Sequence, residues 1–180
     1  MPKPEVLYYD ILESPVGELL LVANADGDVV EIHTGRAVTP RLTDPRAAKL
    51  NAQHDPSRLA PVRREMEEYF AGARKVFTMN TAPQGSAFQK QVWALLRQIP
   101  LGETRTYGQL AAELGVPNAA RAVGRANATN PISIVVPCHR VVGASGALTG
   151  YAGGLPIKKW LLEFEGAIPS TKQESLDGLH

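Results

Sequence analysis

The sequence predicts an α/β protein built from two parts, an N-terminal antiparallel sheet with helices and a C-terminal, mainly helical part. Apolar runs alternate with turn signals over the first third of the 180-residue chain, as in an antiparallel sheet. From Ser86 onward, apolar residues recur at helical spacing. Two short helices separated by a glycine-containing turn then predict a helix-turn-helix in this second part. We place the domains at 1–82 and 83–168 and expect a flexible polar tail at 169–180.

Turn residues divide the N-terminal part into strands. Residues 14–17 separate the first two strands, and Asp26-Gly27 separates the second from a third. The proline-punctuated stretch 37–58 predicts a loop or a short helix, residues 59–72 predict a helix, and residues 75–83 predict one more strand. The predicted helix has four apolar residues on one face: Val62, Met66, Tyr69 and Phe70.

Capping residues mark the helices of the C-terminal part. Ser86 can cap a helix that Pro100 ends. Thr106 and Gln109 have the spacing of a capping box and predict the start of a second, short helix. Pro117 is favourable at a first helical position and is expected to open the third helix.

The last third of the chain predicts a buried strand, a loop and a helix. The apolar run 132–136 predicts the buried strand, and 141–154 predicts a further strand followed by a glycine-rich loop. Residues 156–166 predict the final helix. Its expected core face consists of Ile157, Trp160, Leu161 and Phe164.

Composition excludes several classes of protein. A net charge of +1 gives no global attraction to nucleic acid or membrane, so a polyanion site would need local clustering of Lys and Arg. A single cysteine excludes an intramolecular disulfide and a multi-thiolate zinc site, and it is compatible with a reducing compartment. Because the start lacks the apolar core of a signal peptide and no apolar run reaches about 18 residues, we expect a cytoplasmic protein.

The only cysteine, Cys138, is followed directly by His139. A thiol becomes a nucleophile as its thiolate, which a neighbouring proton acceptor favours. Adjacent residues of a straight strand point to opposite faces, so the pair can cooperate only if the chain bends, as Pro137 suggests. A carboxylate would orient the imidazole, and Glu163 and Glu165 are both candidates. Adjacency alone favours the alternative, a buried thiol that packs as a small hydrophobe.

The predicted third helix is rich in Ala and Gly, and Arg121 and Arg125 lie four residues apart on it. Small side chains allow close approach to another surface, and the two guanidinium groups could contact phosphates. The alternative is a solvated basic face on a packing helix. A helix-turn-helix beside a possible nucleophile suggests chemistry on DNA, with the target nucleotide extruded from the duplex.

Three stretches closely resemble the O6-alkylguanine-DNA alkyltransferases, or methylated-DNA–protein-cysteine methyltransferases. They are SAFQKQVWALLRQIPLGETRTYGQLA, PNAARAVGRANATNPISIVV and PCHRVVGASGALTGYAGG, in the order and spacing of that family. The resemblance extends from about Ser86 to Gly166; the N-terminal part is similar only in its layout. It implies a ribonuclease-H-like N-terminal domain and a winged helix-turn-helix C-terminal domain that holds the active site.

The resemblance implies DNA repair by irreversible alkyl transfer to Cys138 from O6 of guanine or, less readily, from O4 of thymine, once per protein molecule. It implies that His139 takes the thiol proton through a water and that Glu165 orients His139. It further implies that Asn130 braces the helix-turn-helix against the active-site loop, and that Tyr107 crowds the target phosphate and donates a hydrogen bond to the leaving guanine.

The resemblance also implies a DNA and substrate surface. Arg121 would enter the base stack in place of the flipped nucleotide, on a helix that packs in the minor groove of double-stranded alkylated DNA. The backbones of Val141 and Ala152 would contact guanine, with Tyr151 lining the pocket and Lys158 nearby; Ala152 stands where some relatives have serine. The other residues expected to contact DNA are Ala120, Ala122, Gly124 and Arg125.

Cofactor and assembly expectations follow from the same resemblance. Some relatives bind structural zinc in the N-terminal part, but this chain has no cysteine there, and His33 and His54 alone make a poor site, so we predict no metal and no cofactor. We expect a monomer that could bind cooperatively along DNA.

Two alternatives remain beside the repair activity. A non-catalytic alkylated-DNA-binding protein of the alkyltransferase-like type would lack the cysteine, so the intact Cys138, His139 and Glu165 argue against it. A Cys-His hydrolase unrelated to DNA is disfavoured by the helix-turn-helix with Arg121.

Overall fold

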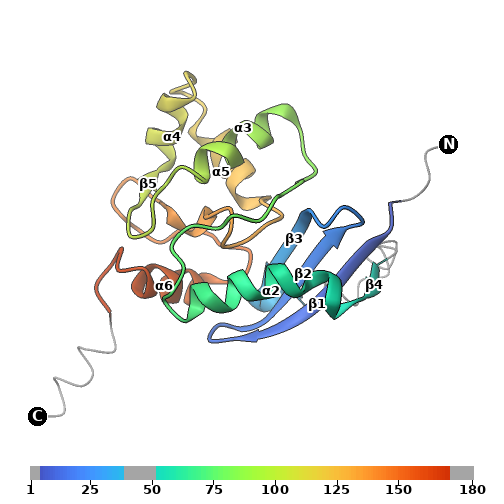
Figure 1. Cartoon of the computed structure of the whole chain (residues 1–180). Coiled ribbons are helices and arrows are strands. Elements are labelled where there is room, and N and C mark those ends of the chain that lie inside the picture. Colours follow the sequence, from blue (N-terminus) through green and yellow to red (C-terminus); the bar gives the residue numbers. More distant parts are fainter. Residues whose placement is uncertain (1–4, 39–51, 171–180) are drawn as a thin grey trace, which may run out of the picture.

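The computed structural model describes residues 5–38 and 52–170 (Figure 1). Predictions for residues 39–51, within the proline-punctuated stretch, and for residues 171–180, within the tail, lie outside the described residues. The chain forms a sheet covered by a helix, joined to a mainly helical part, so the predicted α/β class is confirmed. No helix within the described ranges is long and apolar enough to cross a membrane.

The sheet has the strand order β3-β2-β1-β4. Its strands are β1 (Leu7–Ser14), β2 (Gly17–Asn24), β3 (Val29–Thr34) and β4 (Ala52–His54). The first three are antiparallel, as predicted, but β4 pairs parallel with β1. The prediction of a loop or short helix is therefore wrong for residues 52–54. Three residues, two of them exposed, are too few to show an alternating pattern in the sequence.

Helix α2 (Pro56–Phe70) lies across the sheet (Figure 1). It begins three residues before the predicted position, because the carboxylate of Asp55 accepts a hydrogen bond from the Arg58 N–H at 3.2 Å and caps the helix there. The predicted apolar face is buried at Val62, Met66 and Tyr69, while Phe70 is half-buried. This face anchors α2 to the core.

The prediction of a strand at 75–83 is wrong. Only Thr81 forms a bridge to the sheet, with Val29. The buried carboxylate of Glu65 accepts hydrogen bonds from the backbone N–H groups of Thr78 and Met79, both at 3.0 Å. Because a side chain satisfies these amides, the segment does not need a ladder partner.

The helix-turn-helix is confirmed. Its helices are α4 (Tyr107–Glu113) and α5 (Ala120–Ala128), which follow α3 (Ala87–Leu96). The predicted capping boxes of Ser86 with Gln89 and Thr106 with Gln109 are both present. Helix α5 begins three residues after Pro117, so the prediction that Pro117 opens it is wrong.

The apolar run 132–136 is buried as predicted but is not a strand. Ile134 has φ of 72°, and Ser133 and Val136 bridge each other across a tight turn. Asn130 binds both ends of the run: its Oδ1 accepts from Ile132 N–H at 3.0 Å and its Nδ2 donates to Val136 O at 2.8 Å. An apolar pattern predicts burial, whereas this turn depends on one polar side chain.

The chain then bends at Pro137, as predicted, into the 3₁₀ turn η2 (Cys138–Arg140). The short strand β6 (Val141–Val142) follows directly and pairs parallel with β5 (Arg105–Thr106). This pairing joins the end of the 3₁₀ turn to the start of α4.

The last helix, α6 (Leu155–Phe164), packs against η2. Leu161 is fully buried, and Ile157 and Trp160 are half-buried. Phe164 is 37% exposed, stacks on Trp160 with ring centroids 4.9 Å apart and lies edge-on to the buried Tyr69 ring at 5.5 Å, so it borders the core instead of lying within it. One hydrophobic cluster contains residues from the sheet, from α2 and from the C-terminal helices, and it includes Cys138.

Candidate active site

Cys138 is the first residue of η2 and is only 6% exposed. Its backbone N–H donates to Val136 O at 2.8 Å, and its carbonyl accepts from Asn127 Nδ2 at 3.4 Å. Because residues 138–140 form a tight turn, Cys138 and His139 are not on opposite faces of a strand. The bend that cooperation of the two side chains requires is therefore present.

The His139 ring is completely buried and has distinct partners at its two nitrogens. Nε2 lies 3.0 Å from both carboxylate oxygens of Glu165, so this nitrogen carries the proton. Nδ1 is buried and has no hydrogen-bond partner within the described part of the chain. In this tautomer Nδ1 has a free lone pair and can accept a proton.

Glu165 accepts hydrogen bonds from three side chains. Besides His139, Arg140 donates from Nε to Oε1 at 2.8 Å and from Nη2 to Oε2 at 2.9 Å, and the Tyr69 hydroxyl donates to Oε2 at 2.6 Å. Burial alone would raise the Glu165 pKa, but the bonds from His139 and Arg140 hold it at about 2. Glu163, the other candidate, lies 3.9 Å from Lys159.

Burial shifts the pKa of both members of the Cys138–His139 pair toward their neutral forms. It raises the pKa of the Cys138 thiol, although Asn130 and the Lys158 charge act in the opposite direction. It lowers the pKa of His139, although Glu165 acts in the opposite direction. The resting site therefore holds a neutral thiol and a neutral imidazole, so nucleophilic attack by sulfur requires a proton acceptor.

Lys158 is fully buried and holds the segment that follows the thiol. Its Nζ donates to Val141 O at 2.6 Å and to Thr149 O at 2.8 Å. Burial lowers the Lys158 pKa to about 8. Strand β6 and the glycine-rich loop are thus tied to α6 by one side chain.

The residues expected to contact DNA lie on the helix-turn-helix. Tyr107 is half-buried, and its hydroxyl lies 2.7 Å from Thr149 Oγ1. A Cβ built on Gly124 would be 3.7 Å from the Tyr107 ring, so the two residues face each other. Arg121 and Arg125 are exposed, and neither forms an ion pair with another described residue. Ala120 and Ala122, from the same helix, are half-buried.

The loop beside the thiol packs tightly on the end of β3. Tyr151 is 5% exposed, and the exposed Ala152 accepts a hydrogen bond at its carbonyl from Arg36 Nε at 3.4 Å. A Cβ built on Gly153 would be 2.2 Å from Thr34 Oγ1, closer than any real contact. Only glycine therefore fits where this loop crosses β3.

Replacing Gly153 with alanine is expected to destabilise the fold by about 1–3 kcal/mol, because the loop must move away from Thr34. Urea unfolding would measure the change. Gly150→Ala is the matched control in the same loop, because a Cβ there meets nothing within 4 Å. Similar unfolding free energies for the two variants would contradict the close contact.

His33 and His54, considered above as metal ligands, each lie beside a carboxylate. His33 Nε2 is 3.5 Å from Glu31, and His54 Nε2 is 3.1 Å from Asp10. No cluster of three or more His, Cys, Asp or Glu residues able to hold a metal ion occurs in residues 5–38 and 52–170.

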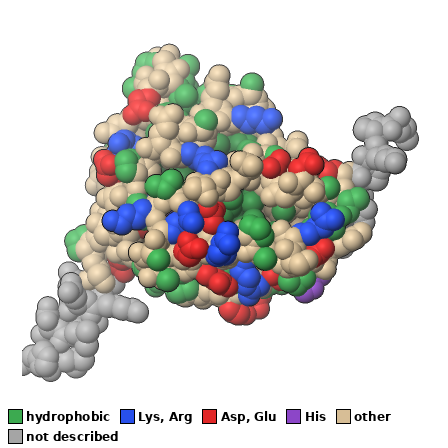
Figure 2. Space-filling model, in the orientation of Figure 1, with side chains coloured by type: hydrophobic (Ala, Val, Ile, Leu, Met, Phe, Trp, Pro, Cys, Tyr) green, Lys and Arg blue, Asp and Glu red, His purple; other side chains and the backbone are tan. Residues whose placement is uncertain are grey.

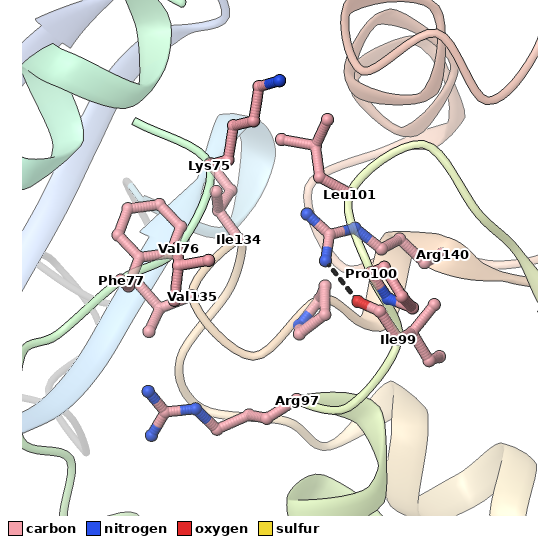
Figure 3. A pocket seen from close by; sticks show the side chains of 11 residues that line it. Lys75, Val76, Phe77, Arg97, Ile99, Pro100, Leu101, Ile134, Val135 and Arg140 are labelled. Atoms are coloured by element: carbon pink, nitrogen blue, oxygen red, sulfur yellow. Dashed lines mark hydrogen bonds between the residues drawn. The ribbon is translucent and has the colours of Figure 1, made fainter. Parts of the chain in front are cut away.

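A cavity of about 390 Å³ lies beside Arg140, the residue that pairs with Glu165 (Figure 3). Arg140 borders it and donates from Nη1 to Ile99 O at 2.6 Å. The remaining lining comes from three segments of the chain: 75–77, 97–101 and 134–137. Cys138, Tyr107 and Tyr151 do not line this cavity, so it is distinct from the space around the thiol.

Comparisons with known proteins cover both parts of the chain. Residues 7–83 match the family model of the 6-O-methylguanine DNA methyltransferase ribonuclease-like domain, and residues 87–167 match that of its DNA binding domain. A methylated-DNA–protein-cysteine methyltransferase of Methanosarcina acetivorans is 47% identical over 162 residues, covering 89% of this chain and 99% of the relative. The chain belongs to the 6-O-methylguanine DNA methyltransferase family.

A second relative and a solved structure extend this likeness to the methyltransferase family. A methylated-DNA–protein-cysteine methyltransferase of Salmonella typhimurium is 60% identical over 105 residues, covering 58% of this chain and 61% of the relative. The crystal structure of Mycobacterium tuberculosis OGT in complex with DNA matches with a TM-score of 0.79 and 41% identity, covering 89% of this chain and 93% of that chain. The expected fold, a ribonuclease-like part followed by a DNA-binding part, is confirmed.

Sequence reasoning missed two side chains at this methyltransferase-family site, Arg140 and Tyr69. Arg140 directly follows His139, and a buried arginine needs a carboxylate partner, so its position was a usable signal. Tyr69 lies 96 residues before Glu165 and was predicted only as part of an apolar helix face. No local sequence pattern connects Tyr69 with Glu165.

Proposed function

We propose that this chain repairs alkylated DNA by direct reversal, with Cys138 as the single-use acceptor of an alkyl group from O6 of guanine. Family membership supports this proposal. The observation that carries it is the neutral Cys138–His139 pair, in which Nδ1 is an unused buried acceptor and Nε2 is held by Glu165. O4-alkylthymine would be a poorer substrate of the same site.

The transfer is a displacement at the alkyl carbon. Sγ of Cys138 forms the new S–C bond while the C–O6 bond breaks and its electron pair passes to guanine. The thiol proton passes through a water to Nδ1 of His139, and the resulting imidazolium is stabilised by the Glu165 carboxylate. The Tyr107 hydroxyl would leave Thr149 and donate a hydrogen bond to guanine, which lowers the cost of the charge that develops there. The thioether product has no route back to a thiol.

A thiol that is only 6% exposed cannot reach a base inside a duplex. The target nucleotide would therefore leave the stack, with the exposed Arg121 filling its place from the minor groove. Asn130 would brace the turn before Cys138, and the flipped base would contact the Val141 and Ala152 backbones beside Tyr151 and Lys158. We infer a monomer that acts on double-stranded DNA in the cytoplasm.

The test is an intact-mass measurement after incubation with a duplex that contains one O6-methylguanine. We expect a gain of one methyl group that peptide mapping assigns to Cys138 and that is absent in Cys138→Ser. Tight lesion binding without a mass gain would favour the non-catalytic DNA-binding alternative. Neither binding nor a mass gain would leave the hydrolase alternative.

A further inference from the structure

One contact connects the N-terminal part of the fold to Cys138, His139 and Glu165, which together form the proposed proton relay. The Tyr69 hydroxyl, on α2, donates to Glu165 Oε2 at 2.6 Å, and Glu165 directly follows α6 as its C-cap. Tyr69 is 1% exposed. Its ring packs against three other aromatic rings at centroid distances of 5.1, 5.4 and 5.5 Å, those of Phe70, Phe77 and Phe164. The aromatic packing fixes the ring, so the hydroxyl has a defined direction.

We propose that Tyr69 is a positioning residue of the relay, whose hydroxyl holds Glu165 and sets how strongly the carboxylate attracts a proton at His139. The proposal rests on the proposed function, because it assigns part of that chemistry to α2. It gives the N-terminal part a chemical role in addition to that of a scaffold.

The physical reason lies in how Oε2 of Glu165 is shared. Three donors approach this oxygen: Tyr69 OH at 2.6 Å, Arg140 Nη2 at 2.9 Å and His139 Nε2 at 3.0 Å. Removing the shortest of these bonds leaves more negative charge facing His139 and favours the imidazolium. A protonated His139 cannot accept the thiol proton, so the loss should be greatest at low pH.

The charged groups around His139 and Glu165 stay in place when the Tyr69 hydroxyl is removed. Arg140 and Lys158 both oppose protonation of His139, and Arg140 keeps its two bonds to Glu165. The titratable and charged groups that influence one another around Glu165 and Tyr69 are Cys138, His139, Arg140, Tyr151, Lys158 and Glu165. Tyr69→Phe therefore changes one hydrogen bond and no formal charge.

The test is the pH dependence of single-turnover methyl transfer from an O6-methylguanine duplex. In Tyr69→Phe, which keeps the ring packing, the acidic limb of the profile should move to higher pH by about one unit, because a hydrogen bond to a charged group is worth about that much. Below this limb the rate should fall about 10-fold, with little change above it. Tyr8→Phe on β1, whose ring lies under Arg58, is the matched control and should leave the profile unchanged.

Two further measurements separate positioning from simple structural support. Placing 3-fluorotyrosine at position 69 keeps the fold and strengthens the donor, so the limb should move to lower pH. In a Glu165→Gln background, Tyr69→Phe should produce no additional shift. An unmoved limb in Tyr69→Phe, or an equal shift with and without Glu165, would overturn the proposal. If the wild-type protein takes no methyl group, the proposed function itself has failed.

Discussion

Replacing Glu165 with glutamine is expected to slow methyl transfer on the order of 100-fold or more. A neutral amide cannot stabilise the imidazolium that forms when His139 takes the thiol proton, so thiolate formation becomes harder. The effective pKa of the Cys138 thiol should rise, while the acidic limb that reports His139 protonation should move to lower pH, because the negative charge that favours the imidazolium is lost. Single-turnover rates across a pH series would measure both effects, and an unchanged profile would remove Glu165 from the relay.

The same substitution is expected to lower the free energy of unfolding by about 3–5 kcal/mol at neutral pH, because it leaves the buried Arg140 guanidinium without a counter-charge. Glu163→Gln is the matched control: Glu163 is half-buried on α6, and its ion pair with Lys159 is long at 3.9 Å. That control should change neither rate nor stability by more than a small fraction of the Glu165 effect.

The stability effect of Glu165→Gln should disappear in acid. The Glu165 pKa is about 2 in the folded protein and 4.5 in its ordinary state, so the folded state binds this proton more weakly than the unfolded state. The stabilisation is complete above about pH 4.5 and is lost as pH falls toward 2. The unfolding free energies of wild type and variant should converge over this window, and a constant difference would contradict the low pKa.

Replacing Arg121 with alanine is expected to weaken repair of duplex DNA about 100-fold and to leave reaction with free O6-methylguanine base nearly unchanged. Extruding a nucleotide costs a few kcal/mol of stacking and pairing, and a side chain that fills the gap offsets part of this cost. Losing about 2–3 kcal/mol corresponds to roughly two powers of ten. A free base needs no extrusion, so it does not require this side chain.

The measurement compares single-turnover rates on the two substrates for each variant. Arg64→Ala on α2 is the matched control, because Arg64 is also exposed and its ion pair with Glu68 is long at 3.9 Å. It should lower neither rate appreciably. Equal losses on duplex and free base in Arg121→Ala would exclude a role in nucleotide flipping.

Most of the C-terminal scaffold was predictable because its signals are local. The capping boxes at Ser86 and Thr106 fix two helix starts, and both occur as expected. The predictions that are wrong in the N-terminal part concern segments whose structure depends on residues far away in the sequence. Strand β4 exists through its pairing with β1, and the 75–83 segment is held by Glu65 instead of by a ladder. Strand β1 and Glu65 are too far along the sequence from these segments for a local periodic pattern to include them.

The candidate site divides in the same way. Cys138 and His139 stand out as neighbours in the sequence, and the bend at Pro137 was expected from the proline. From the residues alone, Glu163 and Glu165 remained equivalent, because choosing between them requires knowing which faces η2. The Tyr69 contact spans 96 residues and was not predictable at all.

The distribution of charged residues along the sequence does not indicate where the site lies. Figure 2 shows Lys and Arg interspersed with Asp and Glu on one face of the molecule, in agreement with a net charge of +1. The charges that matter at the site are instead the buried ones, Arg140, Lys158 and Glu165. Their sequence neighbours include His139, Lys159 and Glu163, so charge patterning along the sequence does not single them out.

The two-residue pairing of β5 with β6 has a mechanical consequence. Thr106, at the end of β5, caps α4 and pairs with Val142, while Val141 directly follows the 3₁₀ turn that carries Cys138. The helix-turn-helix is therefore joined through this strand pairing to the turn that carries the reactive sulfur, and an outward movement of the thiol would have to break the pairing. In the proposed function, the deformation needed for reaction therefore falls on the nucleic acid, which would be bent and opened until the damaged base reaches the thiol.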